Sequence, residues 1–458
     1  MAEIVVIGAG PGGLIAALRA AEIGHEVILL EASETLGGMA ASFQVAGQSV
    51  DFGSHRLHPS TSPILFERLQ GLLGDDLQLR ERNGRIRLGN RWVAFPLRFG
   101  NMVRNLSPLF TSRVCLDMTT RIFRNVGEKS FHERLVSRLG PTITGEFYEP
   151  YSFKLYGVRS VDLAPELARR RISADSPTKI LRKVFAARHL SGRTFFYPRL
   201  GYGQIVDRLA EEAISKGVDI QLDMKVAKIE SAENSVGITT SKHHFSARTV
   251  LSSIPLPVLA SCLQPKPPIE VTEALSKVRT RAMVLVYLVV PRPIYTPFDA
   301  HYFPNDEMFV SRLSEPKNYR TGPDPHDQTV LCAEIPCWKG DRIWEMGADD
   351  LQQLVVSELI ETGLKDPHPV ATEIRRLPSV YPVYELSTDI DRELLSQWAF
   401  SLNSIAVFGR QGLNVPDNLH HVLAMGLDVA NSLREDGSLN LDSWQLALNR
   451  FKDHVVED

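Results

Sequence analysis

Residues 4–31 of the chain read IVVIGAGPGGLIAALRAAEIGHEVILLE. An apolar run meets the spacing Gly8-x-Gly10-x-x-Gly13, and a helix-compatible stretch of small residues follows it. A second apolar run then closes the stretch and ends at Glu31. This order of strand, glycine turn, helix, strand and acid predicts a dinucleotide-binding βαβ unit.

Each part of this stretch has a physical role in that prediction. Gly8 permits a tight turn, Gly10 removes a side chain where a pyrophosphate approaches the backbone, and Gly13 lets the helix pack against the strand. The helix N-terminus offers free N–H groups and the positive end of its dipole to the phosphates. We expect Glu31 to accept hydrogen bonds from the hydroxyls of an adenosine ribose. These residues alone do not distinguish FAD from NAD.

Bulk composition limits the remaining choices. The chain has 458 residues, which suits two or three domains. Its formal net charge of −3 gives no global field for nucleic acid, so no nucleic-acid partner is expected. The four cysteines form no CxxC motif and have no nearby pair of histidines, so we expect neither a metal site nor a redox dithiol.

The sequence predicts a cytoplasmic protein. The first apolar stretch lacks a basic region before it and is interrupted by the glycine turn, unlike a secretory signal. The longest later apolar run, Met283 to Val290, has eight residues. A membrane-spanning helix needs about 20.

Later segments contain further candidate site residues. Gly37 and Gly38 form a glycine pair soon after Glu31, which would let the backbone pass close to a cofactor or would simply form a surface turn. His55 lies in a loop bounded by glycine and proline, which would face a polar ligand or solvent. The aromatic stretch 147–157 would line a substrate cavity or belong to the core.

The texture of the chain changes several times. Apolar residues alternate with arginines over 85–135, which predicts a helical insertion. Segments typical of α/β domains return at 195–255 and again at 400–458, and long strands of a second sheet are expected at 280–290 and 329–335.

Three motifs together resemble the FAD-dependent amine oxidase superfamily, which includes monoamine oxidases, protoporphyrinogen oxidases, phytoene desaturases and UDP-galactopyranose mutases. They are Glu31 followed by Gly37-Gly38, Tyr197-Pro198-Arg199-x-Gly201, and Val407-Phe408-Gly409-Arg410 followed by Asn418 and Gly426. Asp51-x-Gly53-x-His55 and Tyr381-Pro382-Val383-Tyr384 are most similar to the protoporphyrinogen-oxidase-like and mutase-like branch.

The resemblance implies an α/β fold class, with a Rossmann-type FAD-binding domain and an inserted α+β substrate domain made of a mixed sheet and a helical block. The FAD-binding domain would comprise residues 1–84, 195–257 and 399–458. Residues 85–194 would form the helical insertion and residues 258–398 the sheet of the substrate domain.

The resemblance also implies the cofactor-binding residues. These are Gly8, Gly10, Gly13, Glu31, Gly37, Gly38, Met39, Val226, Gly409, Arg410, Asn418, Met425 and Gly426. Thr35 and Met39 stand where the family commonly has arginine, so the pyrophosphate would depend more on backbone groups and on Arg410. A cysteine for covalent flavin attachment has no counterpart near the end of the chain, so non-covalent FAD is expected.

The leading interpretation is a protoporphyrinogen-oxidase-like FAD-dependent oxidoreductase, either an oxidase, a dehydrogenase or a desaturase. It would move a hydride from a small-molecule substrate to flavin N5, with His55, Tyr156 and Arg312 as the polar groups nearest the flavin. The alternative is a UDP-galactopyranose-mutase-like isomerase of a nucleotide sugar, whose diphosphate would need several arginines. A third possibility is an FAD-binding scaffold. The electron acceptor is left open.

The segment from Phe95 to Phe123 carries one more prediction. Its apolar residues alternate with arginines such as Arg104 and Arg113, as in a helix on an anionic bilayer surface. The same pattern is typical of a helical domain whose arginines face water. Peripheral membrane contact is therefore an open expectation.

Overall fold

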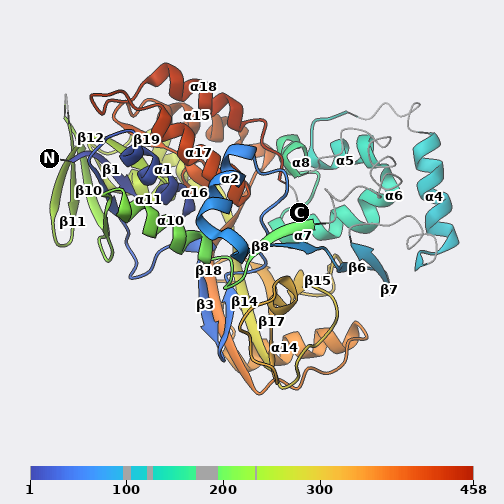
Figure 1. The fold of residues 1–458 in the computed structure, drawn as a ribbon. Helices are drawn as coiled ribbons and strands as arrows, with labels where there is room; N and C mark the ends of the chain where they lie inside the picture. The colour runs from blue at the N-terminus through green and yellow to red at the C-terminus, as the bar shows by residue number, and fades with distance from the viewer. Residues whose placement is uncertain (1, 96–104, 121–126, 172–193, 233–234, 457–458) are drawn as a thin grey trace.

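The computed structural model describes residues 2–95, 105–120, 127–171, 194–232 and 235–456. Two sheets and a helical block form three lobes (Figure 1). In Figure 1 the first sheet lies on the left, the second sheet lies below, and the helical block lies on the right. Arg104 lies outside the described residues.

The first sheet contains the predicted βαβ unit. β1 (Ala2–Ile7) pairs in parallel with β2 (Val27–Leu30) and with β12 (His244–Ser252). On the outer sides, β2 pairs with β9 (Asp219–Gln221) and β12 with β19 (Ile405–Val407). Strands from three distant parts of the chain therefore form one parallel sheet, as the implied Rossmann-type domain requires.

A smaller antiparallel extension continues this sheet. It consists of β11 (Val236–Thr240) and β10 (Val226–Ser231), and the short β13 (Leu263–Gln264) then pairs in parallel with β10 at the edge. β12 is long enough to pair with β11 through its first half and with β19 through its second half.

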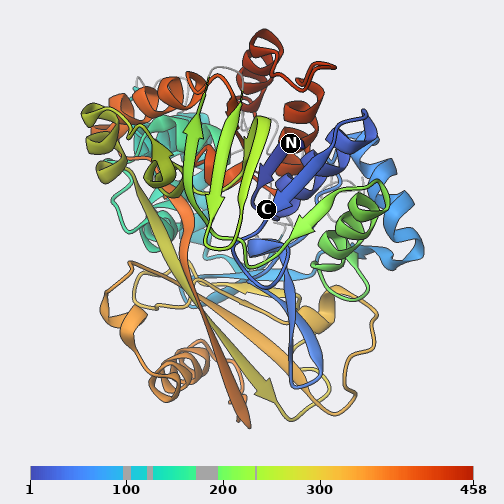
Figure 2. The same ribbon diagram turned by 90° about the vertical axis from the view of Figure 1, so that its left-hand side faces the viewer.

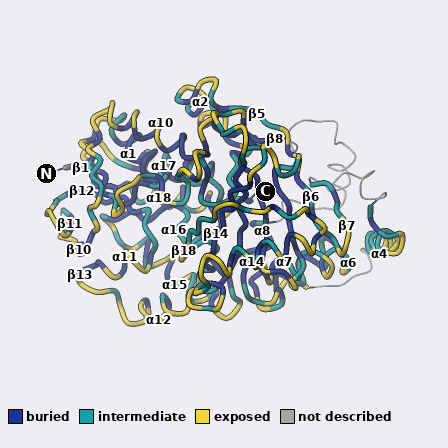
Figure 3. Tube along the Cα trace, turned by 90° about the horizontal axis from the view of Figure 1, so that it is seen from below, coloured by how far each residue is buried: buried dark blue, intermediate teal, exposed yellow. Residues whose placement is uncertain are grey.

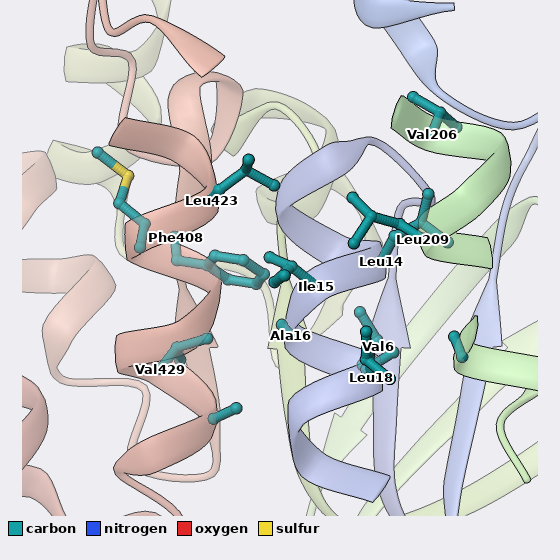
Figure 4. Packing of buried hydrophobic residues seen from close by; sticks show 14 of the residues in the cluster. Val6, Leu14, Ile15, Ala16, Leu18, Val206, Leu209, Phe408, Leu423 and Val429 are labelled. Atoms are coloured by element: carbon teal, nitrogen blue, oxygen red, sulfur yellow. The ribbon is translucent and has the colours of Figure 1, made fainter. Parts of the chain in front are cut away.

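Helix α1 (Pro11–Glu22) is packed on nearly all sides. Nine of its twelve residues are buried, because it lies between α17 (Leu419–Asn431) and α10 (Gln204–Ser215) (Figure 4). Its small residues permit this close packing: a Cβ added at Gly426 would lie 2.5 Å from the Gly12 carbonyl oxygen. Pro11 suits the first helical position, where an N–H would have no partner within the helix.

The second sheet has seven strands in the spatial order β18, β14, β17, β16, β15, β6, β7. They span Ala371–Val383, Arg279–Val290, Thr329–Cys337, Arg312–Ser314, Ala300–Tyr302, Gly84–Leu88 and Arg91–Phe95 in that order. Only β15 and β6 pair in parallel, so the sheet is mixed, as expected. Figure 2 shows the long strands β14 and β18 running side by side.

The helical block begins differently from the prediction. The prediction of a helical insertion that starts at residue 85 is wrong for residues 85–95, because residues 84–95 form the hairpin β6–β7. Arg85 and Arg87 alternate with Ile86 and Leu88, which is the period of a strand, and β15 supplies the edge on which β6 pairs.

The rest of the block is helical in its described parts. It contains α4 (Pro108–Thr119), α5 (Phe131–Leu139), α6 (Pro141–Ile143), a π-helical turn (Thr144–Tyr148), α7 (Glu149–Tyr156) and α8 (Pro165–Arg171). Its core gathers Phe131, Leu135, Leu155, Tyr156 and Leu163.

The remaining elements cover the two sheets. They include β3 (Ser42–Val45), β4 (Gln48–Asp51), β5 (Leu77–Glu81), β8 (Thr194–Pro198), α2 (Pro63–Leu73), α11 (Leu256–Cys262), α12 (Ile269–Lys277), α14 (Ala348–Glu361), α15 (Asp389–Phe400) and α16 (Gly409–Gly412). α18 (Leu441–Phe451) follows α17 near the end of the described chain. None of the helices that the structure describes combines the length and apolar character needed to cross a bilayer.

Candidate active site

The glycine loop, residues 8–13, leaves its backbone open where a ligand would approach. Gly8 has φ +100°, and a Cβ added at Gly13 would lie 1.8 Å from the Gly8 carbonyl oxygen. At Gly10 nothing lies within 4 Å of an added Cβ. Gly10 is the N-cap of α1, and no side chain in the described part of the chain caps this helix. The loop therefore offers free N–H groups at a helix N-terminus, as an anion site requires.

Glu31 lies at the end of β2, directly beside this loop. Its Oε2 accepts a hydrogen bond of 2.7 Å from the Ala9 N–H, and the Ala9 carbonyl accepts one of 2.9 Å from the Gly37 N–H. The Glu31 carbonyl accepts a bond from the Met224 N–H, which places Val226 at the start of β10 close by. The residues expected to hold an adenosine thus come together around Ala9.

The glycine pair leads from this end of the site toward α16. Gly37 and Gly38 have φ of +99° and +53°, and Gln411 Nε2 lies 3.6 Å from Met39 Sδ. Ser253 joins α16 to the glycine loop: its Oγ donates to the carbonyls of Ile7 and Gly8, and its Cβ lies 3.6 Å from an added Cβ at Gly409.

Arg410 extends from α16 toward the substrate domain. It donates to the Asp417 carbonyl (2.7 Å) and to the Val380 carbonyl (2.7 Å), while its buried Nε has no hydrogen-bond partner. Burial lowers the pKa of Arg410, and the neighbouring charge of Arg171 lowers it further. These contacts lie on the substrate side, so the pyrophosphate would depend on the backbone of the glycine loop.

The structure places the predicted α17 residues at two positions. Asn418 is the N-cap of α17, where its side chain and that of His421 form a reciprocal capping box. Met425 is fully buried in the core, and Gly426 packs against α1. Met425 and Gly426 therefore fix the packing of α17 on α1.

His55 and Arg312 lie next to one another. The His55 ring stacks on Tyr202 at 5.1 Å, and its buried Nδ1 has no partner. Arg312 donates to both oxygens of Glu334, at 2.9 and 2.7 Å. Burial lowers the pKa of His55 to about 3, and the charges of Arg312 and Arg410 contribute to this shift. The imidazole is therefore neutral at physiological pH.

Glu334 is the carboxylate that pairs with Arg312. It is 2% exposed, and it also accepts a bond of 2.8 Å from the Ser54 N–H. Burial alone would lower the pKa of Arg312, but the charge and hydrogen bonds of Glu334, together with Tyr302 and Tyr381, raise it well above its usual value. Arg312 is thus a permanent cation held in place by a buried partner.

Tyr156 lies at the end of α7 and is 2% exposed. It contacts Tyr381 in an edge-on arrangement at 6.3 Å, and the Arg171 guanidinium lies over both rings, at 5.9 and 5.4 Å. Both tyrosines also act electrostatically on Arg410. The three predicted residues His55, Tyr156 and Arg312 are therefore brought into one region, linked through Tyr381 and Arg410.

Arg281 completes a group of four cations that we call the arginine cluster: Arg171, Arg281, Arg312 and Arg410. The Arg281 guanidinium lies 4.6 Å from the Trp338 ring and borders Gly157, the residue after Tyr156. Its Nε and Nη1 are buried without hydrogen-bond partners. Burial lowers the pKa of Arg281.

Sequence reasoning did not assign Arg171, Arg281 or Glu334 to the site. Arg171 follows Arg169 and Arg170 in a run of three arginines, a pattern that is typical of a solvated helix face. One signal was available for Glu334: a single carboxylate interrupts an otherwise apolar strand, and a buried charge needs a partner.

A separate cavity of about 680 Å³ opens between β5 and residues 317–326. It is lined by residues such as Arg80, Lys317 and His326 and shares none of the arginine cluster. Neither Glu31 nor Tyr156 lines this cavity.

Family comparison identifies the class of protein. The model of flavin containing amine oxidoreductases matches residues 135–400, and that of NAD(P)-binding Rossmann-like domains matches residues 6–72. The chain belongs to the flavin-containing amine oxidoreductase family. It is an FAD-dependent oxidoreductase of the amine oxidase superfamily.

Particular relatives resemble the chain in different ways. Human mitochondrial dihydrolipoyl dehydrogenase is 51% identical over 37 residues, which are 8% of this chain and 7% of that enzyme. Reduced UDP-galactopyranose mutase has a similar fold over 100% of both chains, with TM-score 0.80 and 20% identity. A protein of Exiguobacterium sp. 255-15, provisionally named protoporphyrinogen oxidase, covers 94% of this chain and 98% of its own, with TM-score 0.76 and 18% identity.

The residues present match the needs of FAD. The open backbone at Gly10, the free N-terminus of α1 and the carboxylate of Glu31 provide for a pyrophosphate and a ribose. Among the described residues, Nδ1 of His55 and Nε of Arg410 lack hydrogen-bond partners, and polar groups of a bound molecule would satisfy them.

Proposed function

We propose that this enzyme oxidises a small organic substrate that carries one or more carboxylates or other anionic groups, as a porphyrinogen does. When bound, FAD supplies the ring nitrogen that accepts the hydride. The protein residues bind and orient the substrate and exclude water.

The observation that carries this proposal is the arginine cluster. The Arg171 guanidinium lies over the rings of Tyr156 and Tyr381, the Arg410 charge acts on both tyrosines, and the Arg312 charge acts on Tyr381. Arg281 pairs with Tyr381 in the second sheet, and Arg312 is bonded to Glu334. Nε and Nη1 of Arg281 and Nε of Arg410 are buried N–H groups with no partner among the described residues, a costly arrangement unless a ligand accepts from them. A cationic amine would be repelled there, whereas an anion would be bound by charge-assisted hydrogen bonds.

His55 suits this setting because it is neutral. With a pKa of about 3 it can donate or accept a hydrogen bond beside the reacting part of the substrate without adding charge. Tyr156 and Tyr381 offer ring faces and hydroxyl groups next to the same cations.

A nucleotide-sugar isomerase of the mutase type is the second candidate. Two observations favour it: the arginine cluster could bind a diphosphate, and the fold matches UDP-galactopyranose mutase along the whole chain. Both candidates require an anionic ligand. They differ in the starting state of the flavin: an oxidoreductase substrate reduces oxidised flavin, whereas the isomerase needs flavin that is already reduced.

Anaerobic titration of the purified flavoprotein separates the candidates. We expect a porphyrinogen to bleach the absorbance of oxidised flavin, and an uncharged polyene or an alkyl amine to leave it unchanged. Turnover of UDP-galactopyranose only after chemical reduction would favour the isomerase. Bleaching by the amine alone would contradict an anionic substrate.

Two arginines over Trp338 form a matched pair for this experiment. Arg281→Met removes the buried guanidinium with unpartnered N–H groups, whereas Arg279→Met removes an exposed one that is already bonded to Glu385. We expect the first substitution to raise the substrate concentration needed for bleaching and the second to leave it unchanged.

We further propose that α4 contacts the surface of an anionic membrane. None of its side chains is buried, Leu109 and Leu116 are each 61% exposed, and Arg113 is exposed beside them (Figure 3). Co-sedimentation with anionic liposomes should occur at low salt and be abolished by Arg104→Glu together with Arg113→Glu. Ile64→Ser, on the exposed face of α2, is the matched control. Absence of sedimentation at any salt would refute the proposal.

A further inference from the structure

We propose that Asp417 and His454 are positioning residues that hold Arg171 and Arg410 at the spacing an anionic substrate group requires. This inference rests on the anion-binding role proposed above. It concerns residues 452–456, which follow α18 and which the site itself does not include.

Asp417 joins both arginines from a buried position. Its side chain is completely buried, and its Oδ1 lies 3.4 Å from Arg170 Nη1. Its backbone carbonyl accepts the bond of 2.7 Å from Arg410 Nη1. One residue therefore binds Arg410 directly and binds the neighbour of Arg171 through its carboxylate.

His454 fixes the orientation of that carboxylate. His454 Nδ1 lies 2.6 Å from Asp417 Oδ2, so the imidazole and the Arg170 guanidinium occupy different oxygens of the same group. The His454 ring is itself held by a parallel contact with His421 at 4.3 Å and by the ring of Phe451 at 5.4 Å.

The segment 452–456 also fixes the end of α8. The Val456 N–H donates to the Arg170 carbonyl at 2.6 Å, and Arg170 Nη1 donates to the Phe451 carbonyl at 3.3 Å. Carbonyls in the last turn of a helix lack partners within the helix, so this bond satisfies one of them. Arg170 and Val456 are 4% and 5% exposed.

The position of Arg171 follows from these bonds. It is the last residue of α8, and its guanidinium lies over Tyr156 and Tyr381. Arg171 and Arg410 repel each other, so their approach needs to be enforced by the surrounding bonds. Figure 1 shows α8 where the helical block meets the lobe that contains α17 and α18.

A cation site is the competing interpretation of the same residues. Asp417, His421 and His454 offer ligand atoms within 4.8 Å of one another. Three observations oppose a cation here. Arg170 already lies at the Asp417 carboxylate, and His421 Nδ1 accepts a hydrogen bond of 3.3 Å from the Asn418 N–H. The nearby N-terminus of α17 is electropositive and would repel a cation. The geometry therefore points to a hydrogen-bonded tie.

The test uses the FAD-loaded protein and inorganic pyrophosphate as the anion probe, with affinity measured by calorimetry. We expect Arg171→Ala to abolish binding, and His454→Ala and Asp417→Ala each to weaken it by roughly fivefold to tenfold, about the effect of one lost ordinary hydrogen bond. FAD content should stay at the wild-type value in all of these variants, and the melting temperature of His454→Ala should stay there too. His454→Asn, which keeps a side-chain N–H, should restore binding.

His368→Ala is the matched control, because His368 is an exposed histidine that also pairs with an aspartate, Asp366, at 3.5 Å. Pyrophosphate binding that is lost in Arg171→Ala but normal in His454→Ala and Asp417→Ala would overturn the positioning role and leave the proposed function intact. Failure of the wild-type protein to bind pyrophosphate would overturn both. Binding of Zn²⁺ alone by the wild type, lost in His454→Ala, would assign these residues to a cation and refute the tie.

Discussion

Two glycines in one loop should fail in opposite ways when replaced by alanine. At Gly13 the added Cβ would lie 1.8 Å from the Gly8 carbonyl oxygen, where Cβ contacts below 3.0 Å essentially never occur. Helix α1 and the loop would have to separate by more than an ångström. Because the obstacle is backbone, no rotamer change can relieve it, and overpacking of this kind costs about 1–3 kcal/mol or more.

Gly10→Ala is the contrasting substitution. Nothing lies within 4 Å of its added Cβ, and its φ of −69° suits alanine. Stability without cofactor should therefore change by only a few tenths of a kcal/mol. The methyl group would occupy the space that a pyrophosphate needs, so FAD affinity should fall by roughly 5- to 150-fold if the same overpacking cost falls on the complex.

Two measurements separate these effects. The ratio of flavin to protein absorbance in the purified protein reports FAD binding, and urea unfolding after removal of the cofactor reports stability. Gly13→Ala should lower stability, and Gly10→Ala should lower flavin content at unchanged stability. The reasoning is refuted if Gly13→Ala unfolds at the wild-type urea concentration, or if Gly10→Ala retains full FAD occupancy.

Substitutions at three further residues test other parts of the structure. Glu31→Ala should weaken FAD retention by about 1.5–3 kcal/mol and Glu31→Gln by less, as measured by equilibrium dialysis, and equal retention in all three proteins would show that this acid does not hold the ribose. Glu334→Gln leaves the Arg312 charge without its buried partner. The free energy of unfolding, measured by hydrogen exchange of the β16 and β17 amides, should therefore fall by about 3–5 kcal/mol. A fall below about 1 kcal/mol would show that the ion pair contributes little to stability. Burial lowers the pKa of His301 from 6.5 to about 3, so its contribution to stability is complete above pH 6.5 and is lost as the pH falls toward 3. His301→Gln should therefore flatten the fall in the free energy of unfolding over this range by up to about 1.4 kcal/mol per pH unit, as measured by urea unfolding. An unaltered slope would mean that His301 is protonated in the folded protein.

The sequence alone predicted the nucleotide-binding half of the molecule, because its signals are local. Within residues 4–31 the turn, the helix and both strands are specified by neighbouring residues, and β1, α1 and β2 form there as expected. A second sheet was predicted from its long apolar strands, and its mixed character was implied by the family resemblance. The hairpin of β6 and β7 was missed, because its pairing partner β15 lies over 200 residues away in the chain.

Only the tertiary structure assembled the arginine cluster. Arg171 lies in α8, Arg281 in β14, Arg312 in β16 and Arg410 in α16, just after β19 of the first sheet. No spacing along the chain therefore connects these four residues. Arg281 also lies beside a register shift between β14 and β18, which changes side-chain directions there. Residue type and period specify which face of an element is apolar, but which charged side chains meet depends on register and packing between distant elements, and these are properties of the folded chain.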